Sequence, residues 1–212
     1  MNKFGIGQPV KRFEDRRLLS GEGRFINDIN LAGQAHAVVV RSPHAHARIK
    51  SIARSAASAA PGVLGIFTGE DLAADGLGTM LPTVQRKRPD GSPMFARSHP
   101  GLATGHVRFV GDPFLLILAE TRSLALDAAE LIEVDFDELP SVTDTARAAA
   151  GKAAVWDECP DNISNVFETG DGAATDAAFA KAAKIVYRRY VISRVYAHFM
   201  EPRGVIGNYD PG

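Results

Sequence analysis

The sequence has one cysteine and no long apolar run, and these absences exclude several classes of protein. Cys159 alone is too little for an internal disulfide or for a zinc or iron–sulfur centre held by cysteines. No stretch approaches the roughly 20 apolar residues of a membrane-spanning helix, and the amino-terminal MNKFGIGQPV lacks the apolar core of a signal peptide. We therefore expect a cytoplasmic protein with no membrane span.

An excess of charge of either sign is also missing. The chain has 24 lysines and arginines against 25 aspartates and glutamates, so no net field attracts it to nucleic acid or to an anionic membrane. Its 212 residues, 45% of them hydrophobic, are sufficient for a buried core. We expect a globular protein that recognises its partners by shape and local chemistry.

The common catalytic motifs are absent as well. There is no phosphate-binding G-x-x-x-x-G-K-[ST], no H-E-x-x-H and no G-x-S-x-G. The G-x-G stretches in SGEGRF and GDGAATD lack the third glycine of a dinucleotide-binding loop. The carboxylate pairs Glu14-Asp15 and Asp135/Asp137 are predicted on exposed faces, where solvation is more common than acid–base catalysis. The residues indicate no catalytic group, no metal ligand and no identifiable cofactor-binding residue.

What the sequence does contain is an alternation of strand and helix patterns. Strands are predicted in AHAVVV (35–40), ARIKSI (47–52), VLGIFTG (63–69), VRFVGDPFLLILAE (107–120), IEVDFDELP (132–140) and KIVYRRYVISRV (184–195). Helices are predicted in ARSAASAAPG (53–62), from Thr121 to Ile132 and in TDAAFAKAA (175–183). Pro43 separates the first two strands, because proline lacks an amide hydrogen. Gly111-Asp112-Pro113 divides the fourth strand segment at a turn or bulge.

The helix that begins near Thr121 has the clearest pattern. Threonine is a favoured N-cap residue. Leu124, Ala128, Leu131 and Ile132 recur at i, i+4, i+7 and i+8, which places them on one helix face. We expect that face to pack on the core.

Other segments have no sustained period. Residues 79–105 contain four prolines and are predicted to form a long surface loop, which in a compact domain is usually functional or disordered. The basic QRKR at 85–88 suggests a partner-binding patch or, more commonly, a solvated charge run. Residues 140–169 are predicted to be a linker between two units. The closing RGVIGNYDPG (203–212) ends on the turn signal Asp210-Pro211-Gly212, after which a further strand is expected.

The stretch RSPHAHARI, residues 41–49, holds two histidines and raises the question of a metal site. In an extended chain His44 and His46 point to the same face, which in principle allows both to coordinate one metal ion. Two ligands fill only half of a tetrahedral zinc site, however, and no nearby Cys, His or Glu obviously completes it. We favour the alternative, in which both are structural histidines at the entrance to a strand.

Glu201 lies between Met200 and Pro202 in HFMEPR, within a largely apolar region. A carboxylate in such surroundings either has a special role or is one half of a structural ion pair. Arg203 and Arg194 are the available partners, and the ion pair is the simpler explanation.

Six blocks of the sequence, taken in order, resemble one enzyme family. They are IGQPVKRFEDRRLLSGEGRFINDI, RSPHAHARIKSI, PGVLGIFTGEDL, RFVGDPFLLILAETRSLALDAAELIEVDFDELPSV, AFAKAAKIVYRRY and HFMEPRGVIGNYDP. In this order they resemble the amino-terminal part of the large, molybdopterin-binding subunit of the molybdenum hydroxylases. That family includes xanthine dehydrogenase, aldehyde oxidase and aerobic carbon monoxide dehydrogenase. The start I-G-x-P-V-x-R-x-E-D-x-R-L-L is most similar to the bacterial carbon monoxide dehydrogenase-like large chains.

The resemblance implies an α+β fold in four parts. They are an amino-terminal arm (1–34), an α/β hammerhead domain (35–142), a linker (143–169) and the truncated start of the first molybdopterin-binding domain (170–212). It also implies that RSPHAHARI is a structural turn and strand of the hammerhead. The family's glycine-rich cofactor loops, active-site glutamine and catalytic glutamate lie beyond Gly212, so we expect no cofactor in this chain, although the full-length subunit carries molybdenum-molybdopterin.

The family reaction is hydroxylation or oxidation of a small carbonyl compound, a heterocycle or carbon monoxide at a molybdenum centre, with oxygen from water. Our first hypothesis is therefore a scaffold fragment of an oxidoreductase, inactive alone. Its implied partners are the rest of the large subunit, an iron–sulfur subunit and a flavin subunit, with self-association through an open strand edge. The second hypothesis is a free-standing protein-binding or assembly module. The third is a small metalloprotein that uses His44 and His46.

Overall fold

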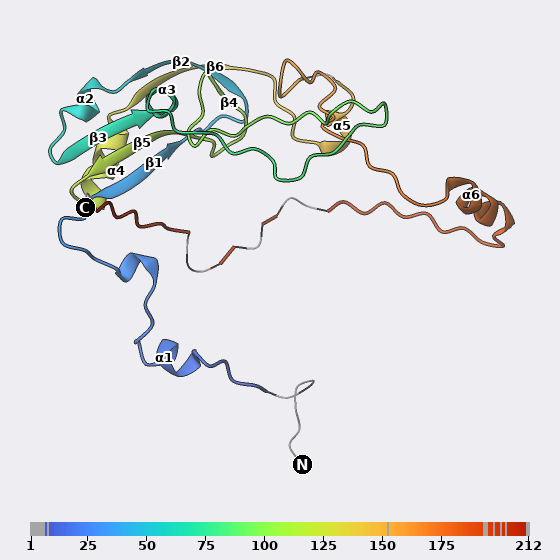
Figure 1. Ribbon diagram of the computed structural model, residues 1–212, viewed down its shortest axis with the longest axis horizontal. Coiled ribbons are helices and arrows are strands. Elements are labelled where there is room, and N and C mark those ends of the chain that lie inside the picture. Colours follow the sequence, from blue (N-terminus) through green and yellow to red (C-terminus); the bar gives the residue numbers. More distant parts are fainter. Residues whose placement is uncertain are drawn as a thin grey trace. The chain divides into compact units, whose positions relative to one another are not determined.

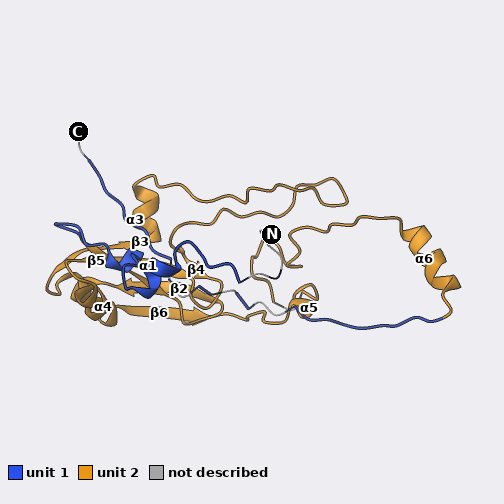
Figure 2. Cartoon of the chain, turned by 90° about the horizontal axis from the view of Figure 1, so that it is seen from below, with its two compact units in different colours: residues 1–34, 184–212 blue, residues 35–183 orange. Residues whose placement is uncertain are grey.

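The computed structural model describes residues 7, 9–151, 153–192, 195–196, 198–199, 201 and 203–210. The chain divides into two compact units, which Figure 2 colours separately. The larger unit is residues 35–183, and the smaller unit joins residues 1–34 with residues 184–212. None of the helices in the described residues is long and apolar enough to cross a membrane.

Two three-stranded antiparallel sheets form the larger unit (Figure 1). The first sheet, in the order β1-β5-β3, consists of β1 (His36–Arg41), β5 (Pro113–Ala119) and β3 (Val63–Thr68). The second, in the order β4-β2-β6, consists of β4 (His106–Val107), β2 (Ala47–Ala53) and β6 (Glu133–Glu138). The helices are α2 (Ser55–Ser58), α3 (Gly69–Ala74), α4 (Arg122–Glu130), α5 (Thr145–Ala148) and α6 (Gly172–Lys181). The predicted α+β class is confirmed.

The core of this unit is centred on β5, whose sequence PFLLILA is apolar throughout. Leu115 and Ile117 have no solvent exposure, and the same holds for Ala125 and Ala128 of α4. These side chains belong to one cluster with residues of the second sheet, among them Val107. Since each Å² of apolar surface removed from water contributes roughly 25 cal/mol, this cluster is the main source of the unit's stability.

Helix α4 begins where the sequence predicts. The Thr121 side chain accepts a hydrogen bond from the Leu124 N–H at 3.2 Å, which makes it the N-cap. Ala128 is fully buried as expected, but Leu131 is 46% exposed. The prediction for Leu131 is wrong because the helix ends at Glu130 and the chain turns there toward β6.

The strand predicted before the Gly111 turn is shorter than expected. Before the turn, only Val107 of that segment pairs with β2, together with the preceding His106, as β4, and the next residues form a turn. The Asp112 carboxylate accepts a hydrogen bond from the Arg108 N–H at 2.9 Å, and Gly111 has a φ of 92°. The Arg108 N–H thus bonds to the Asp112 side chain and not to a carbonyl of a neighbouring strand, so the turn competes with strand pairing.

Helix α3 is one of the short helices that were not predicted, as is α5. The hydroxyl of Thr68 accepts a hydrogen bond from the Asp71 N–H at 3.4 Å, and the Asp71 carboxylate accepts one from the Thr68 N–H at 2.8 Å. This reciprocal capping box satisfies two backbone donors at the start of the helix. Its signature, a threonine followed three residues later by an acid, is visible in TGED.

The smaller unit contains α1 (Asp15–Leu19) and the 3₁₀ helix η1 (Ile26–Asp28). The strand predicted at 184–195 is not formed in the described residues 184–192, which have no strand pairing. Tyr190 is 85% exposed and Ile192 93% exposed. A strand needs a neighbour for its backbone groups, and the described part of the unit supplies none. Residues 193–194 and Pro211-Gly212 of the predicted final turn lie outside the described residues.

We expect replacement of Ile117 by alanine to lower the free energy of unfolding by about 3 kcal/mol, because the change removes buried apolar surface and leaves a cavity. Leu64→Ala is the control, since Leu64 lies on β3 with its side chain 59% exposed, and it should cost less than about 1 kcal/mol. Urea denaturation measures both. Equal losses would contradict a core centred on β5.

Hydrogen exchange should separate the two units. We expect strong protection of the paired residues 38–40 and 115–118, because their amides lie in a packed sheet. Protection at 185–192 should be weak or concentration-dependent, because an unpaired apolar segment either frays or pairs with another chain. Uniform, concentration-independent protection of both regions in a monomer would contradict this expectation.

Candidate functional site

His44 and His46 lie in the corner between β1 and β2, and each contacts the end of β6. His44 Nδ1 lies 3.2 Å from Glu138 Oε1, and His46 Nδ1–H donates to the Pro140 carbonyl at 2.9 Å. The His46 carbonyl accepts a hydrogen bond from the Leu139 N–H at 2.9 Å. The two histidines therefore tie the corner to the point at which the chain leaves the second sheet.

The rest of the corner is also structural. The Ser42 hydroxyl donates to the His44 carbonyl and accepts from the His44 N–H, both at 3.0 Å. The His44 ring packs against Phe136 with centroids 4.9 Å apart. Across the described part of the chain, no group of three or more His, Cys, Asp or Glu side chains is placed to hold a metal ion. The contacts of Ser42, His44 and His46 named here are all with other groups of the protein.

The basic stretch at 85–88 contacts the protein itself. The Arg86 guanidinium lies over the Phe167 ring, 4.9 Å from its centroid, in cation–π geometry. Arg88 donates to the Ile163 carbonyl at 2.5 Å. The interpretation as a solvated charge run is wrong for Arg88 and incomplete for Arg86, because residues distant in sequence supply their partners.

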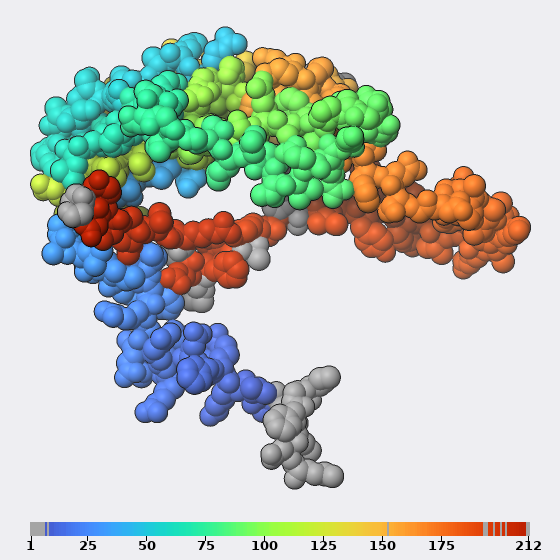
Figure 3. Space-filling model, viewed as in Figure 1, coloured from blue at the N-terminus to red at the C-terminus, as the bar shows by residue number. Residues whose placement is uncertain are grey.

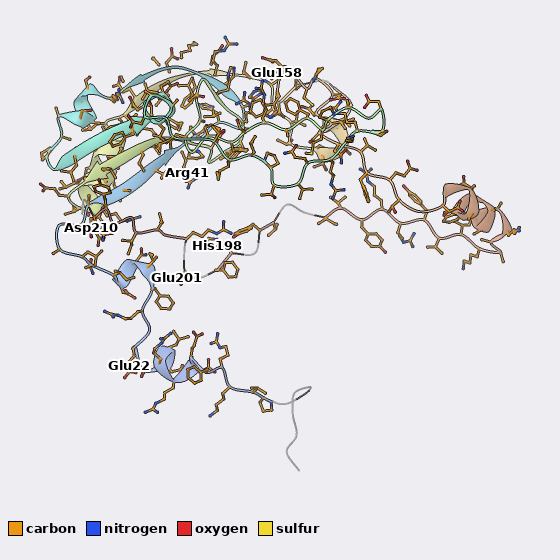
Figure 4. The ribbon with its side chains drawn as sticks, viewed as in Figure 1. Glu22, Arg41, Glu158, His198, Glu201 and Asp210 are labelled. Carbon is orange, nitrogen blue, oxygen red and sulfur yellow. The ribbon has the colours of Figure 1, made fainter. Side chains whose placement is uncertain are left out.

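Trp156 is the centre of a larger cluster of the same kind. The Arg108 guanidinium lies 3.5 Å from the Trp156 ring centroid and the Arg97 guanidinium 5.6 Å, while Phe95 packs at a centroid distance of 6.1 Å. Arg97 also forms an ion pair with Glu158, which Figure 4 labels. Sequence reasoning missed this cluster, because a lone tryptophan in an aperiodic segment gives no local signal of its partners.

Hydrogen bonds to backbone carbonyls also join the segment at 95–108 to the segment at 155–164, and the two segments lie in contact in Figure 3 (green against orange). The Phe95 N–H donates to the Ser164 carbonyl at 3.0 Å, and the Ser164 hydroxyl donates to the Phe95 carbonyl at 2.6 Å. Arg108 Nε donates to the Val155 carbonyl at 3.2 Å, and burial lowers the pKa of Arg108 below its ordinary value. Part of the segment expected to be a linker is thus fastened to the loop at 79–105.

The single cysteine is buried and hydrogen-bonded. Cys159 is 5% exposed, and its thiol donates to an Asp161 carboxylate oxygen at 3.3 Å. Burial raises the pKa of the Cys159 thiol above its ordinary value, and the hydrogen bond to Asp161 raises it further. Because the thiolate is the nucleophilic and metal-binding form, this cysteine is placed for packing and not for reaction.

Glu201, in the smaller unit, accepts a hydrogen bond from the Ile26 backbone N–H at 2.9 Å (Figure 4). This bond satisfies one of the free donors at the start of η1. Arg203 instead donates to the Tyr196 hydroxyl at 2.6 Å, and Arg194 lies outside the described residues. Between the described residues Glu201 and Arg203 there is thus no ion pair, and the expectation is wrong for Arg203: the carboxylate bonds a backbone donor of the arm, and the guanidinium bonds Tyr196.

The most strongly perturbed carboxylate belongs to α3. Arg54 donates to the Asp71 carboxylate at 2.5 Å and to the Ile66 carbonyl at 3.1 Å. The hydrogen bond from Arg54, followed by those from the Thr68 backbone and hydroxyl, lowers the pKa of Asp71 to about 2. Since β3 is an edge strand, Arg54 also covers a carbonyl that would otherwise lie open. The network fastens α3 to β3.

The family model described as "aldehyde oxidase and xanthine dehydrogenase, a/b hammerhead domain" matches residues 20–140. The matched range contains all six strands described above and extends just past β6. This match confirms the hammerhead prediction.

The chain is also similar to individual proteins. It is 38% identical, over 205 residues, to the nicotine 6-hydroxylase large subunit of Paenarthrobacter nicotinovorans. The aligned region covers 97% of this chain and 24% of the relative. Quinoline 2-oxidoreductase from Pseudomonas putida 86 is similar in structure, with a TM-score of 0.63, 40% identity and coverage of 74% of this chain and 19% of that chain. The Cu,Mo-CO dehydrogenase has a TM-score of 0.66 and 34% identity, covering 85% of this chain and 23% of that chain. The chain thus spans about a quarter of the length of the curated relatives it matches.

We expect His44→Ala and His46→Ala each to lower the free energy of unfolding by about 1 kcal/mol, the usual effect of a lost hydrogen bond, and to leave the zinc content unchanged. His198→Ala, which changes an exposed histidine, is the control. Urea denaturation and elemental analysis give the two readouts. A zinc stoichiometry near one that disappears in the double variant would overturn the structural interpretation.

The lowered pKa of Asp71 predicts that the free energy of unfolding depends on pH. Its folded-state pKa of about 2 lies below the ordinary 3.8, so its contribution is present above about pH 4 and is lost as the pH falls through 2. Asp71→Asn should cost roughly 1 kcal/mol at pH 7, a modest value because the side chain is 34% exposed. The gap between wild type and variant should close near pH 2, with Glu70→Gln as the control in the same helix. A gap that stays constant from pH 7 to pH 2 in urea titrations would rule out this role.

Proposed function

The chain belongs to the aldehyde oxidase and xanthine dehydrogenase family through its a/b hammerhead domain, and we propose that it is the amino-terminal scaffold of a molybdenum hydroxylase large subunit. The observation that carries the proposal is the family match over all six strands, in a chain that spans about a quarter of its relatives. Such a chain positions and contacts other parts of an enzyme, and it is inactive alone.

The state of the reactive side chains supports this role. The imidazoles of His44 and His46 are bonded to the end of β6. The Asp71 carboxylate caps a helix, the Cys159 thiol is buried with a raised pKa, and the Glu201 carboxylate accepts a backbone N–H. Each of these groups has a partner within the fold, which supports a structural use of all five.

A shallow groove along α6 does not fit a molybdopterin site. It is lined by Asp171, Ala174, Thr175, Ala178, Phe179 and Ala182. Its single carboxylate, Asp171, already accepts the Ala174 N–H at 2.9 Å, and the groove presents no cation for a phosphate group. We propose that the cofactor, which supplies oxidation or hydroxylation of a small substrate with oxygen from water, is held by parts of a large subunit outside this chain.

We propose that residues 1–34 form an arm, 35–142 the hammerhead, 143–169 a linker and 170–212 the start of a molybdopterin-binding domain. The partners would be the rest of the large subunit together with iron–sulfur and flavin subunits, in the cytoplasm. One relative, named as subunit gamma of the 6-hydroxypseudooxynicotine dehydrogenase complex, supports an assembly of several chains.

The test compares the chain alone with a chimera, in which the chain replaces the matched 23% of the Cu,Mo-CO dehydrogenase chain. We expect the purified chain to hold far less than stoichiometric molybdenum and no pterin, and the chimera to hold both, because the cofactor contacts lie outside this chain. Elemental analysis and the fluorescence of oxidised pterin measure the two contents. Near-stoichiometric molybdenum in the chain alone would overturn the proposal. A folded chimera without molybdenum would favour a free-standing module.

A further inference from the structure

The first sheet has two faces, and the core of the hammerhead uses one of them. Leu115 and Ile117 of β5 are fully buried in the core cluster, and Val38, Val40 and Ile66 of the flanking strands lie in it or pack against it. Helix α4 and the second sheet contribute the other members of that cluster. Since successive strand residues point to opposite faces, the intervening residues form a second face that points away from the core.

That second face, the outer face, is apolar across all three strands. Strand pairing sets Val39, Leu116 and Phe67 in one row and Ala37, Leu118 and Gly65 in the next. None of the six belongs to the core cluster or packs against it. By the same alternation, the next residues along β1 and β5 are Arg41 and Glu120, which lie at opposite ends of the two rows. Charged residues therefore border the rows and do not lie within them, and Phe114, which precedes Leu116 in the alternation, belongs to the core cluster.

The outer face is also accessible and flat. Val39 is 37% exposed, and Leu116, Leu118 and Phe67 are half-buried. A Cβ added at Gly65 would lie 2.8 Å from Cε2 of Phe67, so the phenyl ring lies across the glycine. The ring fills the space that a side chain at Gly65 would take, which leaves a continuous apolar surface.

The second sheet of the same unit shows the contrasting arrangement. Arg48, Lys50, Glu133 and Asp135 are exposed on β2 and β6, and Lys50 lies 3.7 Å from Asp135. An antiparallel sheet with one face in water has this alternation of apolar and polar residues. The first sheet lacks it, so both of its faces have the composition of buried surface.

We infer that the outer face of the first sheet is the surface on which the hammerhead docks onto the remainder of its own large subunit, an inference that rests on the proposed function. The chain spans about a quarter of its curated relatives, so three quarters of a large subunit is available as the occupant. The absence of charge within the two rows, with Arg41 and Glu120 only at their ends, fits a permanent apolar contact within one subunit, because exchangeable partners need a surface that is also stable when exposed. The occupant is therefore an apolar element of that remainder.

The test introduces a charge on this face in both contexts, the chain alone and the chimera with the Cu,Mo-CO dehydrogenase chain. Val39→Lys places an ammonium group in the proposed contact, whereas Ser51→Lys places one on the exposed side of β2, opposite Asp135. For Val39→Lys we expect the melting midpoint to fall by roughly 5 °C more in the chimera than in the chain alone, because a buried charge is costly. For Ser51→Lys the two decreases should be equal.

Hydrogen exchange gives a second readout that needs no variant. Residues 36–41 of β1, an edge strand, should exchange more slowly in the chimera than in the chain alone. If Val39→Lys lowers the melting midpoint equally in the chain alone and in the chimera, and the chimera still holds molybdenum, the docking proposal is overturned and the proposed function stands. A dimer of the chain alone that Val39→Lys dissociates would also overturn it, because the occupant would then be a second copy. Loss of molybdenum from the unaltered chimera would instead count against the proposed function.

Discussion

Strand β5 imposes the main constraint on this protein, because all seven of its residues are apolar and water must be excluded from both of its faces. The inner face meets this requirement through α4 and the second sheet, which share one core with Leu115 and Ile117. The outer face, which includes Leu116 and Leu118, has no place in that core. Such a sheet is stable within this domain through its inner face, and its outer face is suited to packing against a further layer of protein. This is the physical basis for a scaffold role.

Arginine side chains hold the irregular parts of the larger unit in place. Arg88 and Arg108 donate to backbone carbonyls of the segment that follows α5, and Arg108 also stacks on Trp156. Arg54 performs the same task at the edge of β3. A guanidinium has five donors in a planar group that also stacks on rings, so it can satisfy loop carbonyls where no strand or helix supplies a donor. These arginines therefore stabilise the fold. This agrees with a chain whose net charge is close to zero and does not attract nucleic acid.

Histidine and glutamate play a comparable part at the ends of elements. His46 bonds the chain where it leaves β6, and Glu201 bonds the start of η1. Both residues are of types that often mark catalytic or metal sites, yet each has a backbone partner. What a side chain does chemically depends on its hydrogen-bond partners. The partners of His46 and Glu201 named here are backbone groups.

The sequence by itself determined the elements whose cause is local. The N-cap at Thr121, the apolar β5, the order of six family blocks and the T-x-x-D of α3 are all visible in the sequence itself. The tertiary structure alone decided the roles of Arg88, Trp156 and Glu201, because their partners lie far away in the chain and leave no periodic trace. It also decided the failure of the strand at 184–192, since β-branched and aromatic residues favour an extended chain, but a strand forms only where another segment lies beside it to accept its hydrogen bonds.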